Sequence, residues 1–243
     1  MEQGFLIQMA LSIDQWHRRY LQQAAWTQAA RQYLFEKAGI SHCSKVLEVG
    51  CGTGAIIQDF QKYPGIQVTG VDFQYQCCQF TKTDNPIARV ITANGLHLPF
   101  QDHSFDLTFC HFFLLWCGHP EGALREMARV TKTGGSILLL AEPDHEHRID
   151  LPKELHAVGE KQTASLSSQG ADVSIGSRLG EWLYAAGINV NLVGLLSSEW
   201  APKPPGQDFD LEWQIIFQDL NKYPTVWLER MKEVDKAAHK LGT

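Results

Sequence analysis

The hydrophobic pattern alternates short apolar runs with stretches in which apolar residues recur every three or four positions. The short runs are rich in branched side chains and predict buried strands at residues 45–49, 67–72, 88–92, 105–109 and 136–141. The periodic stretches between them predict helices. Strands that alternate with helices favour an α/β fold with a mainly parallel central sheet.

The two ends of the chain show mainly helical periodicity. Residues 1–40 predict amphipathic helices, because Ile13, Trp16, Tyr20 and Ala24 keep a spacing of three to four that Trp26, Ala30, Tyr33, Leu34 and Lys37 continue. Residues 201–243 predict a helical extension in which Trp227, Met231, Val234 and Ala238 share one face. Between these ends, residues 189–196 alternate enough to predict a sixth strand.

The stretch from residue 45 to 55 predicts a strand followed by a glycine loop. Gly50, Gly52 and Gly54 let the backbone turn sharply and bring its amides close to a ligand. Ile57 and Phe60 then follow at helical spacing, which predicts that the loop opens directly into a helix. A strand, a glycine loop and a helix start together predict a nucleotide-binding cradle.

A carboxylate at the end of the second strand supports an adenosine ligand without naming it. Asp72 lies 18 residues after Gly54 (72 minus 54), close to the spacing at which an acidic side chain meets ribose hydroxyls. Gly50, Gly52 and Ala55 also satisfy the relaxed fingerprint of NAD enzymes. These residues alone therefore leave two cofactor classes open.

Glu48 and three later segments separate the two classes. The segments are Asn94–Phe100, Ser104–Phe109 and Glu126–Gly135. With them the chain resembles the class I S-adenosylmethionine-dependent methyltransferases, of the kind that includes quinone and small-molecule methyltransferases, over roughly residues 45–144. The resemblance implies a Rossmann-like three-layer αβα sandwich, S-adenosylmethionine as cofactor and S-adenosylhomocysteine as product.

The resemblance also implies roles for residues along the carboxyl edge of the sheet. Glu48 would hold the amino acid end of the cofactor, Asp72 the ribose hydroxyls, and Phe73 the adenine face. Asn94 stands where the family commonly has an aspartate, and its carbonyl oxygen can still accept a hydrogen bond. The full set of cofactor-binding candidates is Glu48, Gly50, Cys51, Gly52, Thr53, Gly54, Asp72, Phe73, Asn94, Gly95, Leu96 and Cys110.

No residue is assigned as catalytic from the sequence. An acceptor that is already nucleophilic needs no base, whereas an oxygen acceptor would need one, with His111, Glu142 or His145 as candidates. The polar loop 142–150 has two further interpretations. His145 and His147 could bind a metal with a neighbouring carboxylate, although alternating residues in a loop are a nonspecific signal. A solvated turn is the favoured interpretation, and no metal site is predicted.

The N-terminal helices are expected to act as a lid, because helices before the first strand cover the cofactor in the resembling family. Tyr20, Trp26 and Arg31 are the candidates for lid and substrate contacts. The alternative, which we favour for the aromatic residues, is simple packing on the domain. We expect a single domain over residues 1–243, with a helical lid at 1–40, a core at 41–200 and a C-terminal helical extension at 201–243.

The family normally closes its sheet with a seventh, antiparallel strand. We find no strand run after Trp200, so we expect this strand to be missing or irregular. The exposed sheet edge that results would favour a homodimer.

The net charge limits the kinds of molecule that this chain is expected to bind. A net charge of −6 provides no basic face for nucleic acid or anionic lipid. Neither a signal peptide nor a spanning helix is expected, which predicts a cytoplasmic protein. The sequence therefore predicts methyl transfer to a small, partly apolar molecule. A noncatalytic S-adenosylmethionine-binding or interaction protein, and an NAD-dependent oxidoreductase, remain alternatives.

Overall fold

The computed structural model describes residues 11–194 and 206–241 of the chain. Contacts group these residues into two compact units. The first unit comprises residues 11–143 and 175–194, and the second comprises residues 144–174 and 206–241. Residues 144–174 thus group with the C-terminal helices and not with the sheet. The division into ranges 1–40, 41–200 and 201–243 stays a prediction.

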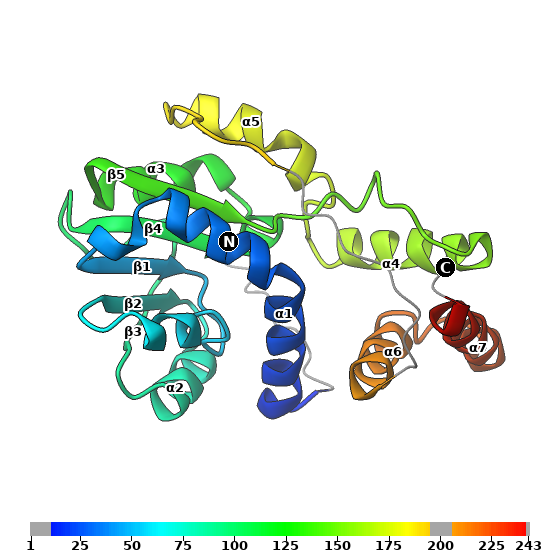
Figure 1. The fold of residues 1–243 in the computed structure, drawn as a ribbon. Helices are drawn as coiled ribbons and strands as arrows, with labels where there is room; N and C mark the ends of the chain where they lie inside the picture. Colours follow the sequence, from blue (N-terminus) through cyan, green and yellow to red (C-terminus); the bar gives the residue numbers. More distant parts are fainter. Residues whose placement is uncertain (1–10, 195–205, 242–243) are drawn as a thin grey trace. The chain divides into compact units, whose positions relative to one another are not determined.

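The first unit is built on a parallel sheet of five strands (Figure 1). The strands are β1 (Lys45–Val49), β2 (Gln67–Asp72), β3 (Arg89–Thr92), β4 (Phe105–His111) and β5 (Thr131–Leu140). Their order is β3-β2-β1-β4-β5, and every neighbouring pair is parallel. The chain direction across the sheet reverses between β1 and β4, which is the place where open α/β sheets bind ligands at the carboxyl ends of their strands.

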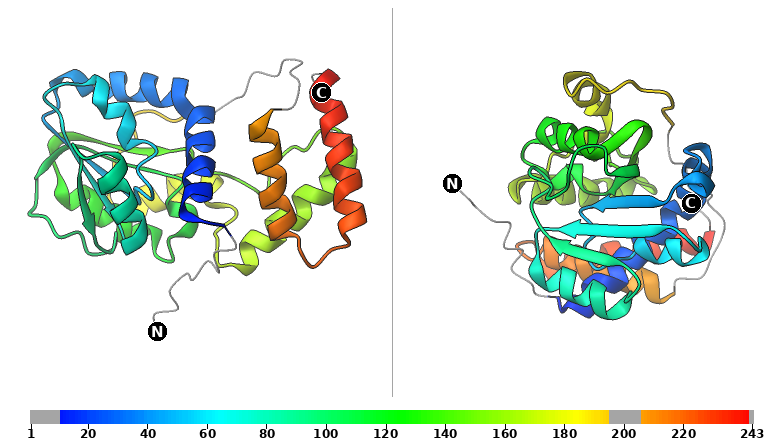
Figure 2. Two further views of the ribbon diagram at one scale, coloured as in Figure 1. Left: turned by 90° about the horizontal axis from the view of Figure 1, so that it is seen from below. Right: turned by 90° about the vertical axis from the view of Figure 1, so that its left-hand side faces the viewer.

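Helices cover both faces of this sheet (Figure 2). They are α1 (Ile13–Lys37), η1 (Ile40–His42), η2 (Ile57–Lys62), α2 (Tyr75–Asp84), η3 (Leu114–Trp116), α3 (Pro120–Val130) and α5 (Ile175–Ala185), where η marks a 3₁₀-helix. Right-handed connections place η2 and α2 on one face and α3 on the other, because β1 to β3 and β4 to β5 run in opposite directions across the sheet. The predicted three-layer α/β fold is confirmed.

An aromatic cluster fastens α1 to the sheet. The ring centroid of Phe35 lies 5.3 Å from that of Phe60 and 5.3 Å from that of Phe109. All three side chains are buried. Such ring pairs contribute about 0.5–1.5 kcal/mol each beyond their burial. The cluster therefore holds α1 beside the carboxyl half of β4.

Two segments with helical spacing form less helix than their periodicity predicts. The segment after the glycine loop forms only the 3₁₀-helix η2, since Pro64 and Gly65 leave too few residues for a stable α-helix. Apolar residues recur at helical spacing from Leu124 to Thr131, which predicts a helix that the glycine pair at 134–135 would stop, but the helix ends at Val130. Thr131 instead pairs with Phe105 in the sheet, and the glycine pair lies within β5.

The predicted face of α1 was also partly wrong. Its buried side chains include Ala24, Thr27, Arg31 and Phe35, whereas Trp26 and Tyr33 are 53% and 51% exposed. The helix follows the stripe that meets the loop and the sheet, even where that stripe is polar. Burial of Arg31 is compensated by its ion pair with Asp59.

The sixth strand is not present where the sequence predicted it. Residues 189–194 form no strand, and Val190 and Leu192 are about half exposed, at 48% and 54%. Residues 195 and 196 of the predicted strand lie outside the described residues. Alternation alone does not make a strand, because the backbone also needs a partner along its edge. Within the described ranges, β5 is the last strand of the sheet and no antiparallel strand joins it.

The second unit is helical. It comprises η4 (Lys153–Leu155), α4 (His156–Ser168), α6 (Gln207–Asp219) and α7 (Thr225–Leu241). Trp213, Leu220 and Leu228 are buried in its core, and Trp213 Nε1 donates to Asp235 Oδ2 at 2.7 Å. The predicted helical face of the C-terminal segment is confirmed, since Met231 lies in this core. Among the residues described, no helix is long and apolar enough to cross a membrane.

Candidate functional site

The glycine loop after β1 is built for close approach to a ligand. Gly50, Gly52 and Gly54 all have left-handed backbones, with φ of 77°, 50° and 80°. Other residues adopt this region at a cost, whereas glycine does so freely. The amides of Gly50 and Cys51 donate to Val71 O at 2.8 and 3.0 Å, which ties the loop to the end of β2. The loop therefore turns at the predicted place, over the carboxyl ends of β1 and β2.

Asp72 anchors the same loop from the neighbouring strand. Its Oδ2 accepts from the Gly52 amide at 2.8 Å, and its Oδ1 accepts from the Gln74 amide at 2.8 Å. Burial raises the pKa of Asp72, while both hydrogen bonds oppose that rise. Each carboxylate oxygen can accept a further hydrogen bond. Phe73, the next residue, is 56% exposed and lies free to cover a planar ligand.

Glu48 is a buried carboxyl group in the middle of the sheet. Its side chain is on β1 and only 2% of the residue is exposed, yet its Oε2 has no hydrogen-bond partner in the described structure. Burial raises the pKa of Glu48 well above its usual value, and the nearby Arg31 opposes this shift. A buried polar atom without a partner is uncommon and indicates a group that awaits a ligand.

Helix α1 lies on the glycine loop. A Cβ atom at Gly52 would stand 3.2 Å from the Tyr20 ring, so that ring rests directly on the loop. His17 Nδ1 and Thr53 Oγ1 lie 2.9 Å apart, which joins the same helix to the loop one residue further on. Burial raises the pKa of the Tyr20 phenol. Of the lid candidates, Tyr20 thus reaches the site directly.

A chain of polar contacts runs from α1 to the end of β4. Arg31 pairs with Asp59 Oδ2 at 2.7 Å and donates to Thr27 Oγ1 at 2.5 Å. Thr27 Oγ1 in turn lies 2.9 Å from His111 Nε2. Burial, together with Arg31, lowers the pKa of His111 to about 3, so this imidazole is neutral at physiological pH. Arg31 therefore reaches the site region, whereas Trp26 is half exposed and stacks with Arg19 instead.

Glu142 serves the backbone around the end of β4. Its Oε1 accepts from the amides of Phe113 and Leu114 at 3.0 Å each, and its Oε2 accepts from the Leu115 amide at 3.1 Å. These are the amides at the start of η3, which have no partner within that short helix. Burial raises the pKa of Glu142, and the three amides oppose the rise. The carboxylate is thus engaged as a cap, which leaves it poorly placed to remove a proton.

Replacement of Glu142 with alanine is expected to lower the free energy of unfolding by about 2 kcal/mol, because three part-buried amides lose their acceptor. Urea denaturation would measure the loss. Glu142→Gln retains one carbonyl oxygen and should lose less. An alanine variant as stable as the wild type would contradict the capping role.

The third base candidate, His145, belongs to the second unit. Burial lowers its pKa. In the same loop, Asp144 Oδ1 accepts from the amides of Glu146 and His147, and Asp144 Oδ2 lies 2.8 Å from His147 Nδ1. The described residues contain no group of three histidine, cysteine or acidic side chains that could hold a metal ion. A catalytic role for His145 stays a prediction.

The remaining cofactor-binding candidates differ in how far their side chains are exposed to solvent. Asn94 is exposed after β3, and its Oδ1 accepts from the Leu96 amide at 2.9 Å. Its oxygen can accept one further donor. Cys51, Thr53 and Cys110 are buried at 5%, 0% and 0% exposure, so their side chains face the interior. Any contact from these three with a ligand would come through their backbone.

The aromatic run 111–116 suits a pocket wall by its sequence, and Phe113 is the member that reaches the loops: a Cβ atom at Gly50 or Gly95 would stand 2.5 or 2.9 Å from its ring. The sequence analysis missed three side chains around this edge, which are His17, Thr27 and Asp59. A signal for two of them existed, because His17, Tyr20, Ala24, Thr27 and Arg31 recur at alternating spacings of three and four. The predicted buried face of this helix used only the apolar residues of that series.

Comparison with known proteins assigns residues 47–139 to a family model described as a methyltransferase domain. A malonyl-[acyl-carrier protein] O-methyltransferase of Erwinia pyrifoliae is 33% identical over 121 residues, which is 50% of this chain and 46% of the relative. A demethylmenaquinone methyltransferase of Renibacterium salmoninarum is 34% identical over 119 residues, which is 49% of each protein. The chain matches about half the length of these curated relatives.

Among solved structures, the YcgJ protein from Bacillus subtilis shares the fold. The TM-score is 0.52 and the sequence identity 20%, over 82% of this chain and 88% of that one. At this identity the likeness concerns the fold alone. It supports the arrangement of strands and helices described above.

Proposed function

We propose that this chain, whose residues 47–139 belong to the methyltransferase domain family, transfers a methyl group from S-adenosylmethionine to a small-molecule acceptor. The resemblance to class I methyltransferases seen in the sequence is confirmed by this match. The observation that carries the proposal for the cofactor is Glu48, whose buried Oε2 has no partner next to a glycine loop. A carboxyl group in that position suits the ammonium of an amino acid.

The residues present fit this cofactor at both of its ends. S-adenosylmethionine supplies an electrophilic methyl group on its sulfonium sulfur. Glu48 would accept hydrogen bonds from the amino acid end, and Asp72 would accept them from ribose hydroxyls with the lone pairs its two amide contacts leave free. The glycine loop permits the backbone to lie close to the ligand. The chain thus contributes binding and orientation.

The proposed acceptor is a small, partly apolar molecule whose nucleophilic atom is already ionised or otherwise reactive. Glu142 is engaged with three amides, and His111, with a pKa near 3, is too weak a base for efficient proton removal at neutral pH. Phe112 and Phe113 directly follow His111 in the sequence, which favours an apolar environment for the acceptor. The relatives named above act on two different acceptors, so they support the class and do not choose its member.

Calorimetric titration with S-adenosylmethionine, S-adenosylhomocysteine and NAD tests the proposal. We expect saturable binding of the first two and none of NAD. Glu48→Gln is expected to raise both dissociation constants about tenfold or more, because a charge-assisted contact with the ammonium is lost. Glu121→Gln, which changes an exposed carboxyl group on α3 that is paired with Arg125, is the matched control and should bind normally.

The pH dependence of the same titration distinguishes Glu48 from a merely structural residue. Burial raises the pKa of Glu48 in the free protein, whereas an ammonium partner favours the carboxylate. Wild-type affinity should therefore fall as pH drops through this raised pKa, and the glutamine variant should lack that dependence. The variant should also unfold no more easily than the wild type at pH 8, because it removes the cost of a buried charge. Failure of the folded wild type to bind either ligand would refute the proposal.

A further inference from the structure

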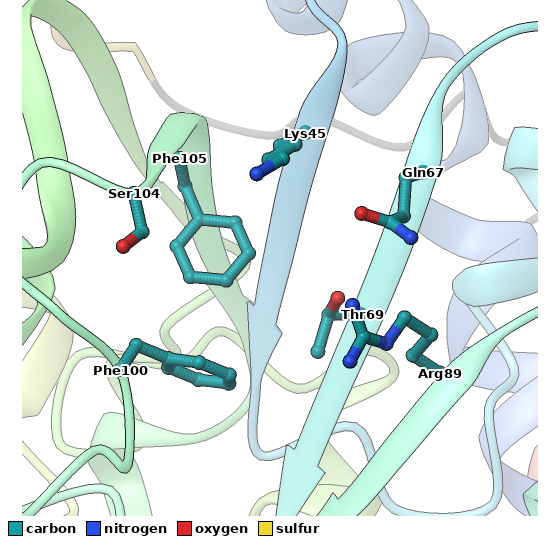
Figure 3. Close-up of a pocket in the computed structure, with 7 residues that line it drawn as sticks. All are labelled: Lys45, Gln67, Thr69, Arg89, Phe100, Ser104 and Phe105. Carbon is teal, nitrogen blue, oxygen red and sulfur yellow. The ribbon is translucent and has the colours of Figure 1, made fainter.

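A cavity lies at the amino ends of the strands, at the opposite end of the sheet from the glycine loop. It has a volume of about 140 Å³ and is lined by residues that include Lys45, Thr69, Arg89, Phe100, Ser104 and Phe105 (Figure 3). We call it the amino-end cavity. Lys45 and Arg89 are the first residues of β1 and β3, whereas Gly50 and Asp72 stand at or just beyond the strands' other ends. Strand length separates the two places by roughly 15 Å, at about 3.3 Å per residue.

Two cations of the amino-end cavity have no counter-ion. Neither Lys45 Nζ nor the Arg89 guanidinium forms an ion pair within the described part of the chain. A nearby carboxylate is already committed, since Asp106 pairs with Lys132 at 2.5 Å and accepts from the amides of Ser44 and Lys45 at 2.8 Å each. Asp102, close to Ser104 in sequence, pairs with Arg129 at 2.8 Å. In a chain of net charge −6, two uncompensated cations beside one cavity create a local site for an anion.

Thr69 provides a second, independent indication of a ligand. The residue is only 4% exposed and lines the cavity, and its hydroxyl makes no hydrogen bond within the described residues. Its oxygen is not one of the fully enclosed polar atoms, so it stays accessible to a ligand in the cavity. The strand register sets Lys45 beside Gln67 and Thr69 beside Arg89, and Gln67 and Thr69 share a face of β2. The sheet itself therefore presents the hydroxyl and both cations on one side.

The rest of the lining provides acceptor and apolar surfaces. Ser104 Oγ donates to Gln101 O at 2.6 Å, so its hydroxyl is oriented by the loop before β4. The rings of Phe100 and Phe105 meet edge to face, with centroids 4.8 Å apart and an angle of 83° between planes. They give the cavity an aromatic wall opposite the charged strand ends (Figure 3).

We propose that the amino-end cavity binds the phosphate group of a small phosphomonoester. Arg89 and Lys45 would hold the phosphate oxygens, Thr69 would donate its free hydroxyl, and the Phe100 and Phe105 rings would contact the apolar part of the ligand. The cavity admits a phosphate group, because 140 Å³ equals about five water molecules at about 30 Å³ each. Free phosphate could bind the same cations, but it has no apolar part to contact the Phe100 and Phe105 rings, so it should bind more weakly than a phosphomonoester. The site is separate from the proposed cofactor site and does not depend on it.

Titration of the full chain with inorganic phosphate and with phenyl phosphate, at constant ionic strength, tests the proposal. Amide chemical shifts would report both the affinity and the place of binding. We expect saturable binding of both probes, tighter for phenyl phosphate, with the largest shifts at the amino ends of β1 to β3. Arg89→Gln and Lys45→Met should each weaken phenyl phosphate binding about tenfold, which corresponds to about 1.4 kcal/mol. Thr69→Val should weaken it about threefold.

Lys82→Met is the matched control, because Lys82 is an exposed lysine on α2 that lies outside the cavity. Its affinity for phenyl phosphate should equal that of the wild type. Equal weakening in Lys82→Met and Lys45→Met would reveal nonspecific charge attraction and overturn the proposal. So would the absence of saturable binding, a preference for inorganic phosphate, or shifts confined to the glycine loop. None of these results would bear on S-adenosylhomocysteine binding, which is measured separately.

Discussion

Asp72→Ala is expected to raise the dissociation constants for S-adenosylmethionine and S-adenosylhomocysteine by about a hundredfold. Two charge-assisted hydrogen bonds to ribose hydroxyls would be lost, and about 3 kcal/mol for the pair corresponds to about that factor. The variant also removes the acceptor of the Gly52 and Gln74 amides, so only the backbone bonds to Val71 O still tie the glycine loop to β2. Calorimetric titration measures the effect, after circular dichroism has established that the variant is folded.

Asp72→Asn separates these two contributions. Asparagine retains one oxygen that can accept from a backbone amide, but it lacks the negative charge. We expect this variant to keep more of the loop's stability than alanine does while still binding the cofactor at least tenfold more weakly than the wild type. Glu121→Ala, which alters an exposed carboxylate on α3, is the control. Unchanged cofactor affinity in a folded Asp72→Ala variant would overturn the ribose-binding role.

Arg31→Met is expected to lower the free energy of unfolding by about 3 kcal/mol. The Arg31 side chain is 3% exposed and pairs with Asp59, whose side chain is 19% exposed. Removal of Arg31 leaves the Asp59 carboxylate largely buried without a partner, which is the costly case for an internal ion pair. The same change removes a donor to Thr27 and the positive charge that moderates the pKa of Glu48. Urea or guanidinium denaturation measures the loss.

A double variant tests whether the loss comes from the stranded charge. Arg31→Met combined with Asp59→Leu should recover much of the stability, because neither charge then remains buried. Arg125→Met breaks the exposed pair with Glu121 on α3 and should cost less than about 1 kcal/mol. If Arg31→Met proved no more destabilising than Arg125→Met, the polar contacts beneath α1 would not hold that helix in place.

The sequence predicted the glycine loop and the strands around the proposed cofactor site because their signals are local. Five apolar runs, the spaced glycines and Asp72 lie within short stretches whose backbone preferences are intrinsic. The structure places Gly50, Gly52 and Gly54 in left-handed conformations and brings Asp72 against the loop. The match of residues 47–139 to a methyltransferase domain model likewise agrees with motifs that follow one another in order along the chain. Such features need no knowledge of what packs against them.

The tertiary structure decided which polar groups remain available. Glu142 was a candidate base from the sequence, yet in the structure it accepts hydrogen bonds from three backbone amides that lie nearly thirty residues earlier in the chain. Thr131 continues the helical spacing of α3, but it pairs with Phe105 in the sheet instead. Residues 189–194 alternate as a strand would, yet they have no partner strand and form none. Hydrogen-bond partners and neighbouring strands are distant in sequence, so periodicity cannot reveal them.

Within α1 the same division is visible in a single helix. The sequence predicted helices over residues 1–40, of which residues 1–10 lie outside the described residues, and the structure confirms a helix in the rest with α1. Only the fold decided that Thr27 and Arg31 would be buried while Trp26 would be exposed. Hydrophobicity favours the opposite choice, but Asp59 and His111, supplied by other elements, satisfy the polar side chains. A buried polar residue is stable only when its partner is in place, and the partner is a property of the tertiary structure.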